Sequence, residues 1–301
     1  MSDWIQPGHL FSQHSLNTYL RCQRRFQLTY IERQPWPMPE EENPRAYQQY
    51  LERGTILHHW LVRRHLGIDM EPIVAACEDE ELRRWWRAAQ EFDDSALPGA
   101  EGGGVREAEL PVVVSLGEYS LYARYDYVAI GSGVGQTRVG DPRPDVDAVI
   151  LDWKTLERVP SLRILRERVQ TRVYLYSFVA AGHVLTGGAP LDPERVEMWY
   201  WFANYPEETA RIAYSRAAYR EDEAWLRALV AEIATRPLDA FALTDDPREC
   251  RRCHYRTLCQ RAAEGAQGAD ASAGEDWLQE EIDLAIDLEL SLDADVPALE
   301  Y

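Results

Sequence analysis

The order of elements along the chain predicts a mixed α/β fold, in which a β-sheet carries helices on its faces. Residues 14–92 show apolar groups at helical spacing, strand-like segments rich in Val, Tyr and Leu follow, and a helix separates them from two further strands. With 301 residues and 46% apolar side chains, the chain is long enough to bury the core of such a fold.

The first third of the chain is expected to be helical. Helices are predicted over residues 14–31, 45–66 and 78–92, because apolar residues recur there at helical spacing. A loop with four prolines (33–44) follows the first helix, and a glycine-rich joint (99–104) follows the third.

The remaining segments are expected to supply the sheet. Residues 107–130 are rich in strand-forming side chains and are interrupted at Gly117 and Glu118, which predicts a hairpin. Beyond a Gly/Pro loop, the predicted order is a strand (147–153), a helix (161–182), two strands (195–204 and 209–214) and a helix (221–235).

Charge is distributed unevenly. The net charge is −19, but residues 262–301 carry 12 acidic and no basic side chains, which leaves −7 for residues 1–261. Five arginine clusters lie within residues 1–261, and such clusters can follow a phosphate backbone. They are Arg21/Arg24/Arg25, Arg63/Arg64, Arg83/Arg84/Arg87, Arg163/Arg166/Arg168/Arg172 and Arg248/Arg251/Arg252/Arg256.

Two regions are expected, an ordered domain (1–261) and an acidic tail (262–301). Between Ile282 and Asp293, apolar and acidic residues alternate, which suits a strand with one acidic face, a helix, or a flexible solubilising tail. An ordered tail would dock a protein partner or cover a basic DNA-binding groove. The chain has no run of about 18 apolar residues and no signal-peptide pattern, so we expect a cytoplasmic protein with no membrane partner.

A predicted apolar strand ends in Asp152, Trp153 and Lys154, and Lys154 is the only lysine among 32 Lys and Arg side chains. Because Arg is the cation everywhere else, this single compact ammonium indicates a function. Residues i and i+2 of a strand face the same side, so Asp152 and Lys154 can act at one point. Phosphodiester hydrolysis needs a bound cation and an activated water. Asp152 would bind the cation, and Lys154 would orient or activate the water.

Other residues are candidates for the same cation. Asp126 is the best-placed second carboxylate, because antiparallel pairing would bring it beside Asp152. Glu109 is a further candidate, with a surface acid as the alternative. His58 follows Gly54 by one helical turn and would complete the ligand set, unless it is a hydrogen-bonded core histidine. Glycine is unfavourable inside a helix, so Gly54 suggests close approach of another element.

Asp126 followed by Asp152-Trp153-Lys154 resembles the core of the PD-(D/E)XK nucleases, in the RecB-like exonuclease branch. Gly54-x-x-x-His58 and Gln170-x-x-x-Tyr174 are similar to two further elements of that branch. The resemblance implies a restriction-endonuclease-like mixed sheet flanked by helices, with a helical N-terminal insert.

The resemblance also implies roles for individual residues. The expected metal is Mg²⁺ or Mn²⁺, held by His58, Asp126 and Asp152, which suits oxygen-rich ligation. Lys154 would complete the catalytic set, and Gln170 and Tyr174 would contact the substrate.

Four cysteines form a second candidate site. Cys250-x2-Cys253-x5-Cys259 places three thiols in one short segment, and either Cys22 or Cys77 would supply a fourth. Four thiolates suit a structural zinc as well as an iron–sulfur cluster, but zinc ribbons usually carry two C-x2-C pairs. The chain is similar to iron–sulfur members of the same branch, which implies a [4Fe–4S] cluster on Cys22, Cys250, Cys253 and Cys259 that clasps both ends of the domain.

These observations lead to one expected function and one alternative. The resemblance implies a metal-dependent DNA nuclease, an exonuclease preferring single-stranded ends, in DNA repair, recombination or CRISPR adaptation. The alternative is a non-catalytic iron–sulfur DNA-binding or scaffold subunit with a vestigial nuclease site. RNA as the substrate is not excluded by the residues.

Overall fold

The computed structural model describes residues 4–34, 44–99, 103–132, 134, 146–251 and 253–261, and at 44–51 and 251 it describes the backbone only. The acidic tail and the loop before β4 therefore lie outside the described residues, and the expectations about the tail stay predictions. No described helix is both long and apolar enough to cross a membrane.

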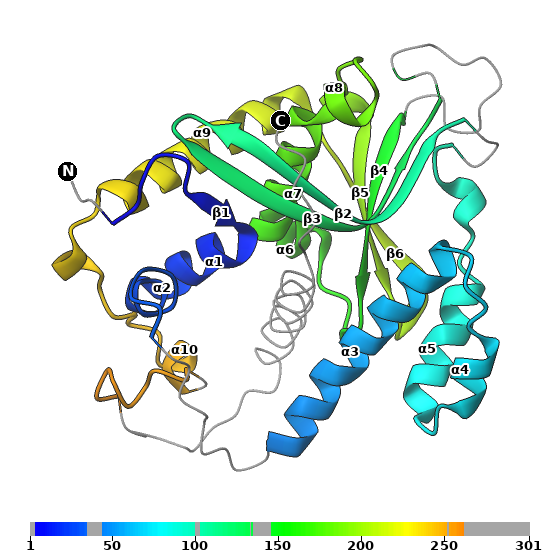
Figure 1. Cartoon of the computed structure of the whole chain (residues 1–301), viewed down its shortest axis with the longest axis horizontal. Helices are drawn as coiled ribbons and strands as arrows, with labels where there is room; N and C mark the ends of the chain where they lie inside the picture. Colours follow the sequence, from blue (N-terminus) through cyan, green and yellow to red (C-terminus); the bar gives the residue numbers. More distant parts are fainter. Residues whose placement is uncertain are drawn as a thin grey trace.

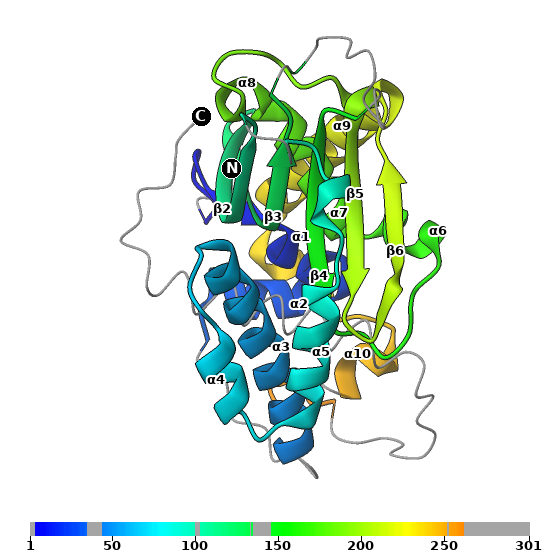
Figure 2. The same ribbon diagram turned by 90° about the vertical axis from the view of Figure 1, so that its right-hand side faces the viewer.

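A six-stranded mixed sheet forms the centre of the fold, with helices on both faces (Figures 1 and 2). The strand order is β1-β3-β4-β5-β6, and β2 pairs with the other edge of β3. β1 runs parallel to β3 and β4 parallel to β5, whereas the other pairs are antiparallel. The strands are β1 Leu10–Ser12, β2 Val105–Leu116, β3 Tyr119–Ile130, β4 Ala148–Lys154, β5 Val196–Phe202 and β6 Tyr205–Ala213.

The helices belong to three groups. α1, α2 and α10 lie at the end of the molecule where the N-terminal and C-terminal segments meet, and α3, α4 and α5 form a helical arm (Figures 1 and 2). α6, α7, α8 and α9 come from the second half of the chain. The bounds are α1 Gln13–Arg21, α2 Gln23–Phe26, α3 Pro44–His65, α4 Glu71–Ala76, α5 Glu80–Gln90, α6 Leu162–Glu167, α7 Val169–Ala180, α8 Gly182–Leu185, α9 Arg216–Thr235 and α10 Pro247–Arg251.

Two hydrophobic clusters cover the two faces of the sheet. In β4, Ile150 belongs to the cluster with α1, α7 and α9, whereas its neighbours Val149 and Leu151 belong to the cluster with the helical arm. This alternation follows from the two-residue period of a strand. β4 is buried along its whole length, as expected of a strand that is covered on both faces.

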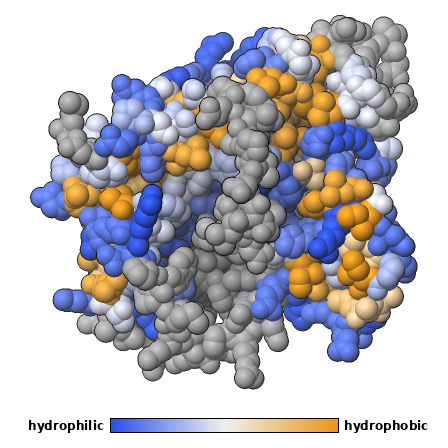
Figure 3. All heavy atoms as spheres, viewed as in Figure 1, coloured by the Kyte–Doolittle hydropathy of each residue, from blue (hydrophilic) through white to orange (hydrophobic). Residues whose placement is uncertain are grey.

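Hydrophobic residues also reach the surface. Exposed examples at and beyond the end of α3 are Leu66, Ile68 and Ile73. Figure 3 shows hydrophobic residues among hydrophilic ones over the helical arm, so the visible surface there is mixed rather than continuously apolar.

The expected mixed α/β sheet is confirmed, but two long predicted helices are interrupted. The segment 14–31 breaks at Cys22, whose backbone is extended and whose sulfur caps α2 by accepting the Arg25 amide hydrogen. The segment 161–182 breaks at Arg168, where ψ is 139°. The short β1 and α4 were not predicted, because three and six residues are too few for a periodic signal.

Candidate active site

One edge of β3 changes its pairing partner partway along the strand, and the point where β3–β4 pairing stops is called here the opening between β3 and β4. β2 occupies one edge of β3 along its length, so β1 and β4 share the other edge. β1 pairs there with residues Ser120 to Tyr122, and β4 pairs with residues Tyr127 to Ile130. Asp126 lies one residue beyond the last β3–β4 pair, which places it at the opening.

Asp126 lies directly across from the predicted catalytic strand. The last pair is Tyr127 with Leu151, so continuing the register places Asp126 opposite Asp152. The Asp126 carboxylate accepts a hydrogen bond from the backbone N–H of Trp153 at 2.8 Å. This contact holds the two strands together at the point where ladder pairing stops.

His58 approaches the same point from α3. Its side chain is buried, with Nδ1 lying 3.6 Å from Asp126 Oδ1 and Nε2 3.1 Å from the carbonyl oxygen of Trp153. The imidazole also packs edge-on against the Trp153 ring, with centroids 5.6 Å apart. α3 therefore places the His58 imidazole at the opening between β3 and β4. Gly54, one helical turn earlier, is also buried.

Glu109 completes a compact group of ligand atoms. In β2 its neighbours Ala108 and Leu110 pair with Tyr127 and Tyr125, which places Glu109 opposite Asp126. Its φ is +52°, a left-handed conformation that costs a non-glycine residue roughly 1–2 kcal/mol. One ligand atom from each of His58, Glu109 and Asp126 lies within 4.8 Å of the others. The left-handed backbone of Glu109 is a kind of strain that is typical of functional sites.

The group offers the donors that a divalent cation needs. Carboxylate oxygens and an imidazole suit Mg²⁺ or Mn²⁺, and the Trp153 carbonyl oxygen is a further oxygen donor beside His58. The Glu109 carboxylate is 3.1 Å from the guanidinium of Arg124, which is 7% exposed. Arg124 thus restrains this carboxylate and balances part of the negative charge of the group.

Asp152 and Lys154 form a buried ion pair next to this group. Lys154 Nζ is 2.7 Å from Asp152 Oδ2, and the two side chains are 0% and 1% exposed. The other oxygen, Asp152 Oδ1, accepts a hydrogen bond from the Gln170 side-chain amide at 3.0 Å. Asp152 lies outside the compact group of His58, Glu109 and Asp126, and its carboxylate contacts Lys154 and Gln170.

The Tyr200 ring packs beside the Asp152–Lys154 pair. Lys154 Nζ lies 5.9 Å from the centre of the Tyr200 ring, and the Tyr200 hydroxyl is 2.7 Å from the Thr171 hydroxyl. Burial, with a contribution from the Asp152 carboxylate, raises the pKa of Tyr200 well above its ordinary value. Tyr200 therefore supports the ion pair by packing, with its hydroxyl hydrogen-bonded to Thr171.

Gln170 and Tyr174 have different surroundings, although they lie on the same face of α7. Gln170 contacts Asp152, whereas the Tyr174 hydroxyl is 3.4 Å from the Gln13 side-chain amide at the start of α1. The Tyr174 ring packs edge-on against Tyr125, with centroids 5.1 Å apart. The structure thus connects the Gln170-x-x-x-Tyr174 element to α1, a link with no signal in the sequence.

The four cysteines Cys22, Cys250, Cys253 and Cys259 line one small cavity. Burial raises the pKa of the thiols of Cys250, Cys253 and Cys259, and the neighbouring sulfurs raise it further. Cys77 lies elsewhere, half-buried before α5, with its thiol directed at the Asp79 carbonyl.

Segments from both ends of the domain meet around this cavity. The Arg24 amide donates to the Ala242 carbonyl at 3.0 Å, and the Gln27 side chain donates to the Leu238 carbonyl at 2.9 Å. The Tyr255 hydroxyl donates to the Gln34 carbonyl at 3.2 Å. The cavity therefore lies at a junction that other contacts already hold together.

The arginine clusters are less available for a phosphate backbone than their sequence suggests. Each of several members has an acidic partner within 4.0 Å, which neutralises part of its charge locally. The pairs are Arg21–Glu249, Arg24–Glu32, Arg84–Glu81, Arg163–Glu167, Arg172–Asp222 and Arg248–Asp246.

Comparisons with known proteins give the family of the chain. The profile of the PD-(D/E)XK nuclease superfamily matches residues 10–260, so the chain belongs to this superfamily. A crystal structure from Eubacterium rectale, described as that of a candidate exonuclease, is similar with a TM-score of 0.44 and 10% identity. The similarity covers 87% of this chain and 91% of that one. No curated protein matches the sequence.

Proposed function

We propose that the chain is a divalent-metal-dependent nuclease that hydrolyses DNA phosphodiesters at the opening between β3 and β4. The observation that carries this proposal is the group of His58, Glu109 and Asp126 ligand atoms, within 4.8 Å of one another, beside the buried Asp152–Lys154 pair. From the resemblance alone, the proposal includes an exonuclease mode on single-stranded ends, in DNA repair, recombination or CRISPR adaptation.

The proposed metal ligands are His58, Asp126 and Asp152, with Glu109 and the Trp153 carbonyl oxygen as further donors. A bound Mg²⁺ or Mn²⁺ would neutralise developing charge on the phosphate and lower the pKa of a bound water. Asp126 accepts from the Trp153 backbone N–H and so restrains β4 here, and the Trp153 carbonyl oxygen lies 3.1 Å from His58 Nε2. Arg124 holds Glu109 in place.

Lys154 supplies the second element of the proposed chemistry. Its ammonium is fully buried and held by Asp152, so it presents a fixed positive charge and N–H donors at the end of β4. Such a group orients an attacking water and stabilises negative charge that develops in the transition state, because preorganised donors in a dry site act most strongly. Gln170 fixes the orientation of Asp152 from the other side.

The second proposed cofactor is a [4Fe–4S] cluster on Cys22, Cys250, Cys253 and Cys259. The shared cavity supports a common ligand. The preference for a cluster over zinc rests on the ligand spacing in the sequence, because zinc ribbons usually carry two C-x2-C pairs, and on the resemblance to iron–sulfur members of the same branch.

The test of the proposed activity is cleavage of end-labelled single-stranded and double-stranded DNA by wild type and Lys154→Gln. We expect the wild type to cleave DNA with Mg²⁺ or Mn²⁺ and not with EDTA. Lys154→Gln should lose at least about 100-fold in rate, the scale for removing one preorganised group. DNA binding, measured by fluorescence anisotropy in EDTA, should be retained.

Two controls accompany this test. Thermal unfolding of Lys154→Gln is needed because removing one member of a buried ion pair can cost about 3–5 kcal/mol. A parallel assay on labelled RNA decides the substrate class. A folded wild type that binds DNA but cleaves neither DNA nor RNA would instead favour the non-catalytic DNA-binding alternative.

A further inference from the structure

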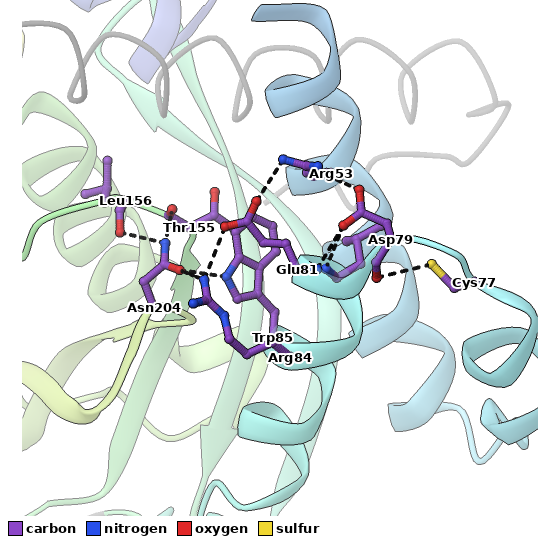
Figure 4. Close-up of polar contacts among 10 residues, drawn as sticks. Arg53, Cys77, Asp79, Glu81, Arg84, Trp85, Thr155, Leu156 and Asn204 are labelled. Atoms are coloured by element: carbon purple, nitrogen blue, oxygen red, sulfur yellow. Dashed lines mark hydrogen bonds and ion pairs between the residues drawn. The ribbon is translucent and has the colours of Figure 1, made fainter. Parts of the chain in front are cut away.

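Asn204, in the turn between β5 and β6, uses the full hydrogen-bonding capacity of its side-chain amide (Figure 4). Its oxygen accepts from the Trp85 indole N–H at 2.8 Å and from the Arg84 guanidinium at 2.7 Å. Its nitrogen donates to the carbonyls of Thr155 at 2.8 Å and Leu156 at 3.0 Å. Two donors and two acceptor positions are thereby satisfied, which fixes the amide in one orientation.

The backbone that Asn204 holds comes directly after Lys154. Thr155 and Leu156 are buried. Leaving their carbonyl oxygens without a hydrogen-bond donor would therefore destabilise the fold. The residue before Asn204, Ala203, donates its backbone N–H to the Lys154 carbonyl at 2.8 Å. The turn between β5 and β6 therefore restrains three successive residues at the end of β4.

On its other side, Asn204 is held by the helical arm. Trp85 is 1% exposed in the core of the arm. The Arg84 guanidinium, which also contacts Asn204, lies 3.2 Å from the Glu81 carboxylate. Arg53 of α3 reaches Glu81 at 2.8 Å and the α5 N-cap Asp79 at 2.6 Å (Figure 4). These contacts lead back to α3, which also carries His58.

We propose that Asn204 is a positioning residue that keeps the end of β4, with Asp152 and Lys154, in register with the helical arm that supplies His58. The proposal rests on the proposed function, because it concerns two halves of one metal-binding site. Without Asn204, the two halves keep the direct contact between His58 and Trp153, but the backbone after Lys154 loses its link to the helical arm. Residues that orient metal ligands typically contribute about 10–100-fold to metal affinity or activity.

The contacts in this network are not equal in strength. The side chains of Arg53, Asp79 and Glu81 are about one-third exposed, and that of Arg84 is 59% exposed, so solvent screens their ion pairs. The Trp85 indole N–H is buried with Asn204 as its acceptor. The Trp85–Asn204 bond is therefore the contact through which the arm should act most strongly.

Neighbouring tryptophans provide a matched test. Trp85→Phe and Trp86→Phe remove the same atoms from adjacent positions of one hydrophobic cluster, where the rings are 1% and 4% exposed. The Trp86 indole N–H has no hydrogen-bond partner among the described residues. Only Trp85→Phe therefore breaks a bond to Asn204, and any common effect on packing cancels in the comparison.

The experiment measures Mn²⁺ binding by calorimetry and steady-state DNA cleavage for wild type, Trp85→Phe, Trp86→Phe and Asn204→Ala. We expect Trp85→Phe and Asn204→Ala to weaken Mn²⁺ binding and lower kcat by about 10-fold or more, the scale of ligand-orienting residues. The KM for DNA should change little, and Trp86→Phe should match wild type in both measurements. Asn204→Asp, which keeps the acceptor but not the donor for Thr155 and Leu156, should resemble Asn204→Ala.

The outcomes separate this proposal from the proposed function. Wild-type Mn²⁺ affinity and kcat in folded Asn204→Ala, or equal losses in both tryptophan variants, would overturn the positioning role alone. A wild type that binds Mn²⁺ but cleaves no nucleic acid would overturn the proposed function and leave Mn²⁺ affinity as the readout for Asn204. A wild type that binds no Mn²⁺ would overturn both.

Discussion

Gln170 shows why a motif does not specify the role of each of its residues. Its position one turn before Tyr174 indicates a shared helix face, and the resemblance implies that both contact substrate. In the structure, the Gln170 amide donates to Asp152 Oδ1, and Tyr174 packs against Tyr125. In the proposed site this hydrogen bond would give Gln170 an orienting role, because it fixes the direction of the Asp152 carboxylate.

This role makes a prediction for Gln170→Ala. Loss of the amide leaves Asp152 Oδ1 without this donor while Lys154 still holds Oδ2, so Mn²⁺ affinity and kcat should fall by about 10-fold or more. DNA affinity measured in EDTA by anisotropy should stay within about twofold, on the scale of a contact worth less than 0.5 kcal/mol. Tyr174→Phe is the control from the same helix face. Weaker DNA binding at unchanged Mn²⁺ affinity would instead favour direct substrate contact by Gln170.

Glu109 could be named from the sequence only as a candidate, with a surface acid as the alternative, and the Trp153 carbonyl could not be named at all. Glu109 is one of 51 acidic residues, and its left-handed backbone and its position opposite Asp126 appear only when β2 pairs with β3. A backbone carbonyl carries no side-chain signal at all. Asp152 and Lys154 could be singled out because a strand places alternate residues on one face and because the chain has one lysine.

At the scale of elements, periodicity predicted the long helices and strands but not their breaks. β2 and β3 form the expected hairpin, and β4 occupies the expected segment. The break at Cys22 depends on a sulfur accepting a backbone hydrogen bond, which no apolar period reports. The short β1 depends on pairing with β3, a contact between residues more than 100 positions apart.

The beginning of β4 offers a test of element stability that is independent of catalysis. Asp147 is 6% exposed and binds the Arg195 guanidinium through two bonds of 2.7 and 2.8 Å, linking the starts of β4 and β5. Asp147→Ala should lower the free energy of unfolding by about 2 kcal/mol, less than a fully buried pair because Arg195 is partly exposed. Urea denaturation measures this loss.

A surface pair provides the comparison. Arg163 and Glu167 are 78% and 64% exposed on α6, so Arg163→Ala should cost less than about 0.5 kcal/mol. Equal losses in Asp147→Ala and Arg163→Ala would show that burial does not determine the contribution of these ion pairs.

At the scale of the whole molecule, the cysteine cavity joins segments more than 200 residues apart in sequence. If the proposed cluster binds these cysteines, it closes a loop of this length and so restrains the unfolded chain strongly. Loss of one ligand should therefore affect the domain as a unit rather than the cavity alone.

We expect Cys253→Ala to lose visible absorbance and thermal stability together, as judged by an anaerobic spectrum and thermal unfolding. Cys77→Ala is the matched control, because Cys77 lies outside the cavity. A colourless, zinc-containing wild type would contradict the iron–sulfur assignment, and retention of colour in Cys253→Ala would contradict the ligand set.

The central claim is that the opening between β3 and β4 binds a divalent cation with ligands from α3 and both strands. The most direct test is an anomalous-difference map from a crystal of the wild-type protein soaked in Mn²⁺. The account predicts a peak bounded by His58, Asp126, Asp152 and the Trp153 carbonyl oxygen, at metal–oxygen distances of about 2.0–2.6 Å. A well-ordered crystal with no peak at these residues, or with Mn²⁺ bound only elsewhere, would contradict it.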